Sequence, residues 1–238
     1  MQLKNSLNTS WRLSVMASAF ATFSLFCLKA VAGNSGFQAQ QITRSMITAD
    51  TIKMTAGVPL KAEDVSPLLA GERIPLLKLP GASGEIFDLN RSVAEKPTIL
   101  VFYRGGWCPY CSKQLAGLQE IEGDLTKLGY QIIAISTDSP DNLSKSRSKG
   151  KLSYTLLSDA DLNAAKRFGI AFKSPKSYDK FLPETSGGKN VDKLLPVPSV
   201  FILSKKGYIL FEYINPNITQ RLSAPLLKAA AAALREEV

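Results

Sequence analysis

The chain has 238 residues and a hydrophobic content of 45%, which is sufficient for a substantial core, and it carries a formal net charge of +9 with no histidine. Without histidine, Ser-His-Asp and Cys-His catalysis and histidine-ligated metal or haem sites are excluded. The basic residues form no stripe with a nucleic-acid readout motif, so the charge indicates solubility and we expect no nucleic-acid partner.

Residues 1–32 have the layout of a secretory signal peptide. Lys4 and Arg12 precede an apolar run from Leu13 to Leu28, and the small residues Ala30-Val31-Ala32 follow. We expect cleavage after this site and export to the periplasm or another extracytoplasmic space. The run is shorter than the ~20 apolar residues of a spanning helix, so we expect no membrane insertion after cleavage, whereas an uncleaved segment would anchor the protein.

The rest of the chain divides into a leader and one domain. Residues 33–64 are mixed and polar without a strong hydrophobic period, and they predict an N-terminal leader of unknown role. Residues 65–238 carry the strand and helix patterns, and we expect them to form a single domain.

The domain begins with short strand patterns and then a strand that is apolar throughout. Residues 76–79 and 86–89 flank a turn that contains proline and glycine, which predicts a hairpin. The run from Thr98 to Tyr103 is typical of a strand covered on both faces, so we place it at the centre of a sheet.

A helix, a strand and a second helix are predicted next. Leucine and isoleucine recur at helical spacing from Leu115 to Leu128, and Gly129 stands where a C-terminal cap belongs. Residues 130–136 alternate as a strand does, and Ser139-Pro140 indicates a helix start.

The later elements complete an α/β pattern. They are a strand at 154–157, a helix at 159–168, a polar loop insertion at 173–193, a hairpin formed by 199–203 and 208–214, and a helix at 223–235. This order predicts a three-layer α/β/α sandwich with a mixed central sheet and an N-terminal hairpin extension.

Two cysteines at the start of the first long helix carry the chemistry. Cys27 lies in the predicted signal peptide, so the mature chain holds only Cys108 and Cys111, which can pair only with each other. The first turn of a helix offers unpaired N–H groups and the positive end of the dipole, and both favour thiolate over thiol. The pattern therefore predicts a redox site.

Two other interpretations of the cysteine pair are weaker. A structural zinc site needs about four cysteine or histidine ligands, and one C-x-x-C supplies only two. A purely structural disulfide would close so short a loop that it removes little entropy from the unfolded chain. We therefore expect neither a metal nor another cofactor.

Helix geometry gives the two cysteines different roles. With Cys108 as the N-cap and Pro109 at the first helical position, the N–H of Cys111 points back at the Cys108 sulfur. Cys108 is then the exposed thiol with the lower pKa, and Cys111 is its resolving partner one turn further on. Arg104 is the nearest fixed charge, either stabilising the thiolate or a peroxide oxyanion, or solvated at a surface turn.

The motif from Phe102 to Cys111 resembles that of peroxiredoxin-like proteins of the AhpC/TSA family, which have a thioredoxin fold. The Gly71-Glu72-x-x-Pro75 segment, the glycine of the predicted hairpin, Gly84, and the run from Pro196 to Phe201 follow in the family's order. The resemblance implies a thioredoxin-like domain and a thiol peroxidase that reduces hydrogen peroxide or organic hydroperoxides. It also implies a thioredoxin-type dithiol as the reductant, with an oligomer as one option.

The sequence departs from the family's P-x-x-x-T-x-x-C pattern at the site itself. In that register Cys111 is the cysteine that attacks peroxide, which is the opposite of the helix argument, while Arg104 replaces the proline and Cys108 the threonine. Pro198 stands where an activating arginine is expected. The departures resemble thioredoxin, in which a cis-proline faces the cysteines, and Val197-Pro198 is the candidate cis bond.

Two functions follow from these residues. The first is a thiol peroxidase that cycles through a Cys108–Cys111 disulfide, and the alternative is an exported protein thiol:disulfide oxidoreductase. Trp107 and Tyr110 are expected to shape the surface around the sulfurs or to pack in the core. The predicted catalytic residues are Cys108, Cys111, Arg104 and Pro198.

Overall fold

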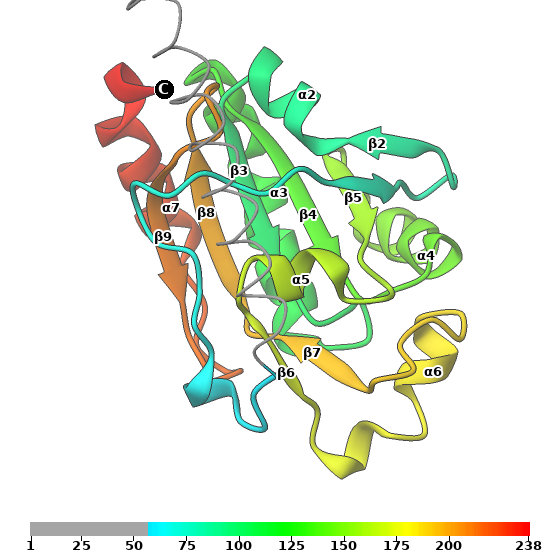
Figure 1. The fold of residues 1–238 in the computed structure, drawn as a ribbon. Coiled ribbons are helices and arrows are strands. Elements are labelled where there is room, and N and C mark those ends of the chain that lie inside the picture. The colour runs from blue at the N-terminus through cyan, green and yellow to red at the C-terminus, as the bar shows by residue number, and fades with distance from the viewer. Residues whose placement is uncertain (1–56) are drawn as a thin grey trace, which may run out of the picture. The chain divides into compact units, whose positions relative to one another are not determined.

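A computed structural model of the protein describes residues 57–238 (Figure 1). The predicted signal peptide at 1–32 lies outside the described residues, and so does the predicted leader except for residues 57–64. Within the described range, no helix combines the length and the apolar character that crossing a bilayer requires.

A five-stranded mixed sheet forms the centre of the domain, with strands in the order β5-β4-β3-β8-β9. β3, β4 and β5 are parallel, whereas β8 runs antiparallel to both β3 and β9. The predicted central position of the apolar strand is therefore confirmed. The strands are β3 (Thr98–Phe102), β4 (Gln131–Ser136), β5 (Thr155–Ser158), β8 (Ser199–Leu203) and β9 (Ile209–Ile214).

Helices cover both faces of this sheet, because the side chains of a strand alternate between the two faces. On β3, Leu100 and Phe102 belong to one hydrophobic cluster, and Ile99 and Val101 belong to the other. The first cluster takes in α2 (Leu89–Glu95) and α5 (Asn163–Arg167), and the second takes in α3 (Pro109–Lys127), α4 (Pro140–Gly150) and α7 (Ala224–Ala233). Figure 1 shows α5 in front of the sheet and α3 behind it, which confirms the three-layer sandwich.

The helix starts follow the predicted capping rules. Ser139 precedes α4, and its hydroxyl accepts a hydrogen bond from the Asn142 N–H. Gly129 follows α3 with a φ of 96°, a left-handed conformation that glycine adopts without strain. The predicted helix at 159–168 is shorter than expected, because residues 159–162 form a turn in which the Leu162 N–H bonds the Asp159 carbonyl.

Two small antiparallel ribbons flank the central sheet. The first is the predicted N-terminal hairpin, formed by β1 (Lys78–Pro80) and β2 (Ile86–Asp88). The second, formed by β6 (Ala171–Lys173) and β7 (Leu194–Pro196), was not predicted. This ribbon joins the two ends of the predicted loop insertion at 173–193. The insertion is not only a loop, because it contains η2 (Lys176–Tyr178) and α6 (Leu182–Thr185). The remaining described elements are η1 (Ala62–Asp64) and η3 (Arg235–Glu237).

Candidate active site

The turn between β3 and α3 is fixed to the end of β4 by side chains that follow that strand. The Thr137 hydroxyl donates to the Arg104 carbonyl at 2.9 Å, and the Asp138 carboxylate accepts from the Gly106 N–H at 2.7 Å. A Cβ on Gly105 would lie 2.1 Å from an indole atom of the Trp107 side chain, so only glycine allows the indole to pack there. These contacts hold the turn in position before the helix begins.

Cys108 is the N-cap residue of α3, and Pro109 is the first helical residue, as predicted. The geometry falls short of a capping hydrogen bond, but several groups lower the pKa of Cys108 to about 6. The largest effect is a hydrogen bond from the Cys111 thiol; the Cys111 amide and the charges of Arg104 and Arg221 add to it, against the opposing effect of burial. These effects favour the thiolate form of Cys108.

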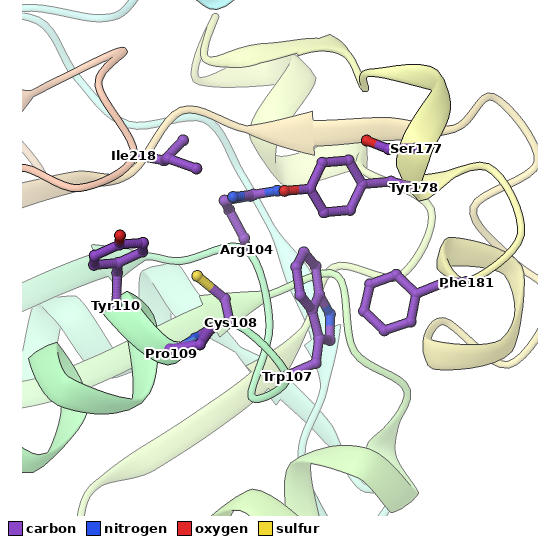
Figure 2. A pocket seen from close by; sticks show the side chains of 9 residues that line it. All are labelled: Arg104, Trp107, Cys108, Pro109, Tyr110, Ser177, Tyr178, Phe181 and Ile218. Atoms are coloured by element: carbon purple, nitrogen blue, oxygen red, sulfur yellow. The ribbon is translucent and has the colours of Figure 1, made fainter.

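The prediction that Cys108 is exposed is wrong for the residue as a whole, of which only 2% is accessible. The sulfur nevertheless lines a pocket of about 360 Å³. Figure 2 shows it pointing into the space between Tyr110 and Arg104. A small oxidant can thus reach the sulfur although the surrounding residues cover most of the side chain.

Cys111 lies in the core, where it packs between α3 and the sheet and has no accessible surface. Its hydrogen bond to Cys108 and its burial hold the pKa of this thiol well above the ordinary value. The Arg221 guanidinium donates to the Cys111 sulfur with a distance of 3.7 Å between nitrogen and sulfur. Both cysteines are free thiols in this structure.

Arg104 is buried beside the pocket instead of being solvated at the turn, since only 3% of the residue is accessible. Its guanidinium carbon lies 5.0 Å from the centre of the Trp107 ring and 4.5 Å from that of Tyr178. These cation–π contacts hold the charge near Cys108. No carboxylate within residues 57–238 forms an ion pair with it.

The pocket wall combines the motif with two distant segments. Trp107, Pro109 and Tyr110 come from the motif. Of the two predicted roles for the aromatic residues, they therefore take the first, which is to shape the surface around the sulfur. The rest of the wall comes from the insertion and from the loop between β9 and α7, namely Ser177, Tyr178, Phe181 and Ile218 (Figure 2). The Trp107 and Phe181 rings meet edge to face at 4.5 Å.

Pro198 is buried between β7 and β8, and the predicted cis bond before it is wrong. No cis peptide bond occurs in the described part of the chain. The preceding residue, Val197, is held in the β6–β7 region by a hydrogen bond from its N–H to the Ile170 carbonyl, and the trans form of an X-Pro bond is favoured where nothing imposes the other. Pro198 is not among the residues that line the pocket with Cys108.

Several residues of the site were not predicted from the sequence. Arg221 lies far along the chain from Cys111 and belongs to no motif, so no sequence signal identifies it. Tyr178 and Phe181 are aromatic residues in an otherwise polar insertion, which is a signal that could have found them. Asp138, in contrast, comes two residues after the predicted strand at 130–136, and burial raises the pKa of its carboxyl to about 6.

The residues described here provide no metal site, because no group of three or more histidine, cysteine, aspartate or glutamate side chains among them could hold an ion. What the site offers is a reactive thiolate, a second thiol one helical turn away and a buried cation beside the first sulfur. That set fits redox chemistry at sulfur.

The fold and the site together define a thiol-based oxidoreductase of thioredoxin-like architecture. The profile of the AhpC/TSA family matches residues 70–211. Peroxiredoxin Bcp of Escherichia coli K12 is 35% identical over 106 residues, which cover 44% of this chain and 67% of Bcp. A putative peroxiredoxin of Mycobacterium tuberculosis is 29% identical over 155 residues, which cover 64% of this chain and 88% of the relative.

Solved structures agree on the fold. Peroxidoxin BcpB of Mycobacterium tuberculosis superposes with a TM-score of 0.57 at 20% identity, covering 72% of this chain and 98% of that one. Peroxiredoxin Q of Xanthomonas campestris superposes with a TM-score of 0.55 at 21% identity, covering 70% of this chain and 98% of that one. The chain therefore belongs to the AhpC/TSA family, and it is an oxidoreductase of the peroxidase type.

Proposed function

We propose that this protein is a peroxiredoxin-type thiol peroxidase in which Cys108 attacks the peroxide. The observation that carries the proposal is the position of Cys108, which lines a pocket next to a buried arginine that has no acidic partner among residues 57–238. A thiolate is the nucleophilic form of cysteine, and a nearby cation stabilises the negative charge that develops on the peroxide oxygens.

In the first step the Cys108 thiolate attacks the terminal oxygen of the hydroperoxide. The O–O bond breaks, the sulfur becomes a sulfenic acid, and the remaining alkoxide leaves as an alcohol after taking a proton from solvent; with hydrogen peroxide the leaving product is water. Arg104 favours this step electrostatically, because it lowers the pKa of Cys108 and faces the same pocket.

In the second step the Cys111 thiol condenses with the sulfenic acid to give a Cys108–Cys111 disulfide and water. The Cys111 side chain lies close enough to lower the pKa of Cys108, and one helical turn separates the two thiols, so little movement is needed. An external dithiol of the thioredoxin type then reduces the disulfide by exchange, and both cysteines return to thiols. Early formation of the disulfide protects Cys108 from further oxidation.

The alternative, a protein thiol:disulfide oxidoreductase, is not favoured by the comparisons, because the curated relatives are peroxiredoxins. We also propose export of the protein, on the layout of residues 1–32. Cell fractionation followed by N-terminal mass spectrometry tests this: we expect a mature chain that begins at Gly33 outside the cytoplasm, and an intact cytoplasmic chain would contradict it.

Stopped-flow kinetics test the peroxidase proposal. The reduced protein is mixed with hydrogen peroxide or cumene hydroperoxide, and its oxidation is followed by tryptophan fluorescence. We expect oxidation far faster than that of a free thiol such as cysteine, and turnover when a thioredoxin-type dithiol is added. Oxidation no faster than that of free cysteine, combined with rapid exchange with protein disulfides, would instead establish the alternative.

A further inference from the structure

Arg221 is a cation whose position the steps proposed above do not explain. It lies in the loop between β9 and α7, followed by Leu222, which is buried in the hydrophobic cluster that includes α3, and by Ser223, the N-cap of α7. The Ser223 hydroxyl accepts a hydrogen bond from the Leu226 N–H, which fixes the start of α7. The buried leucine and the capped helix therefore hold the arginine in place on both sides of the packed core.

The contacts of the Arg221 guanidinium leave its charge without an anionic partner. Nη1 donates to the Gln220 carbonyl at 2.8 Å and Nη2 donates to the Cys111 sulfur at 3.7 Å, whereas the buried Nε forms no hydrogen bond. Among residues 57–238, no carboxylate forms an ion pair with Arg221. A half-buried charge without a partner loses hydration and gains little in return. The ionisable group that it contacts in the described structure is the Cys111 thiol.

The Cys111 thiol is neutral in the reduced protein, so the charge of Arg221 matches a different state of this sulfur. The hydrogen bond to Cys108 and burial raise the pKa of Cys111, while the Arg104 N–H and the Arg221 charge act in the opposite direction. Donors placed at an atom where negative charge develops stabilise the state in which that charge is present. The Cys111 sulfur takes on a negative charge when the Cys108–Cys111 disulfide is broken.

We propose that Arg221 is a catalytic residue of the reductive half of the cycle, in which its guanidinium stabilises Cys111 as the leaving thiolate. This rests on the proposed function and deepens it, because it assigns a residue to the recycling step. The reductant attacks Cys108, whose sulfur lines the pocket, since Cys111 has no accessible surface.

The electrons and protons of this step balance within the disulfide and the dithiol. A thiolate of the dithiol forms a bond to the Cys108 sulfur, the Cys108–Cys111 bond breaks, and its electron pair stays on Cys111. The second thiol of the reductant then gives its proton to the Cys111 thiolate and attacks the mixed disulfide. Cys108 is released as a thiolate, and the dithiol leaves as a cyclic disulfide.

Reduction of the disulfide is measured without peroxide. The protein is oxidised with diamide, and its reduction by dithiothreitol is followed by tryptophan fluorescence in a stopped-flow instrument. Arg221→Gln and Arg221→Met, which both lack the charge, should slow this reduction by about tenfold, the effect of a hydrogen bond to a charged group. Arg221→Lys, which keeps the charge, should recover most of the rate. Arg91→Gln, which removes an exposed arginine paired with Glu95 on α2, is the matched control and should keep the wild-type rate.

A neutral phosphine separates stabilisation of the leaving group from attraction of an anionic reductant. Tris(hydroxypropyl)phosphine attacks the same sulfur without a charge, Cys111 again leaves as a thiolate, and water converts the phosphine to its oxide. We expect Arg221→Gln to lose the same factor with both reductants. Slowing with dithiothreitol alone, no slowing with either reductant, or equal rates in Arg221→Lys and Arg221→Gln would overturn the role of Arg221. Slow oxidation of the wild-type protein by peroxide would instead contradict the peroxidase function and leave these reduction rates unaffected.

Discussion

Cys108 and Cys111 lie in the first turn of one helix, but they face two different regions of the molecule. Cys108 faces a pocket bordered by aromatic rings and the Arg104 cation, whereas Cys111 faces the packed core between α3 and the sheet. The pKa of the first is lowered and that of the second is raised. Helix position and environment therefore act together to lower the pKa of one thiol and raise that of the other.

The largest expected effect is that of Cys108→Ser, which removes the attacking sulfur. Its oxidation by peroxide should slow by at least about 10³-fold, because a buried thiol with a raised pKa cannot replace a thiolate. In Cys111→Ser the first oxidation should remain within about tenfold of the wild-type rate. Stopped-flow traces of both variants measure this, and the reverse pattern would show that the family register identifies the nucleophile correctly.

Loss of Cys111 should abolish recycling instead of attack. In Cys111→Ser the sulfenic acid on Cys108 has no internal thiol to condense with, so repeated peroxide exposure should convert it to sulfinic acid. Intact-protein mass spectrometry should show a gain of two oxygens at Cys108, whereas the wild-type protein loses two hydrogens. Steady dithiol-dependent turnover by this variant would contradict the role of Cys111 as resolving cysteine.

Substitution of Cys111 also tests the cause of the low Cys108 pKa. Cys111→Ala removes the side-chain donor, so the pKa of Cys108 should rise from about 6 toward the ordinary thiol value. Cys111→Ser keeps a hydroxyl donor and serves as the matched control, with a smaller rise. Thiolate absorbance near 240 nm against pH reports both values, and identical pKa values in the two variants would exclude this hydrogen bond as the main cause.

We expect Arg104, beside the Cys108 pocket, to affect the rate of peroxide oxidation more than Arg221, beside the Cys111 sulfur. Arg104→Gln removes the cation beside the Cys108 pocket and should slow peroxide oxidation at pH 7 by roughly twofold to tenfold, through a higher Cys108 pKa and weaker oxyanion stabilisation. Arg221→Gln should have the smaller effect, since its guanidinium contacts the Cys111 sulfur. A larger loss in Arg221→Gln would assign peroxide activation to the core side of the turn.

Among these substitutions, those of Asp138, which holds the turn before Cys108, should change the rate of peroxide oxidation least. Their expected effect is on stability. Asp138→Ala leaves the Gly106 N–H without its acceptor and should lower the free energy of unfolding by about 1–3 kcal/mol. Asp138→Asn keeps an acceptor. Because burial raises the native-state carboxyl pKa to about 6, wild-type stability should fall relative to Asp138→Asn as the pH rises from about 4 to 6. Urea unfolding across that range measures both, and no pH trend would contradict the shift.

Local sequence patterns predicted the scaffold well, because each depends on neighbours in the chain. The apolar run from Thr98 to Tyr103, the Pro109 helix start and the Gly129 cap are local signals, and the structure confirms them, with the strand ending at Phe102. The partners of the cysteines depend on tertiary contacts. Arg221 reaches the site from a distant segment and belongs to no motif, so its role becomes visible only when the chain is folded.

Tertiary contacts also decided two predictions that did not depend on local patterns. One was an analogy with thioredoxin, and the other was the solvent exposure of Arg104. The cis bond at Val197-Pro198 was inferred from thioredoxin, and the described backbone is trans there. Arg104 had a solvated turn as one option, but the rings of Trp107 and Tyr178 bury it. The aromatic insertion, whose ends are joined by β6 and β7, supplies part of that cover and left no periodic signal in the sequence.

Alkylation of the wild-type protein by iodoacetamide tests the central claim most directly, with the modified fraction of each cysteine measured by peptide mass spectrometry from pH 4 to 10. Cys108 should react first, with a rate that rises to a plateau around a midpoint near pH 6, and Cys111 should stay unmodified until far higher pH. Preferential modification of Cys111 at neutral pH would contradict the assignment of Cys108 as the attacking thiolate.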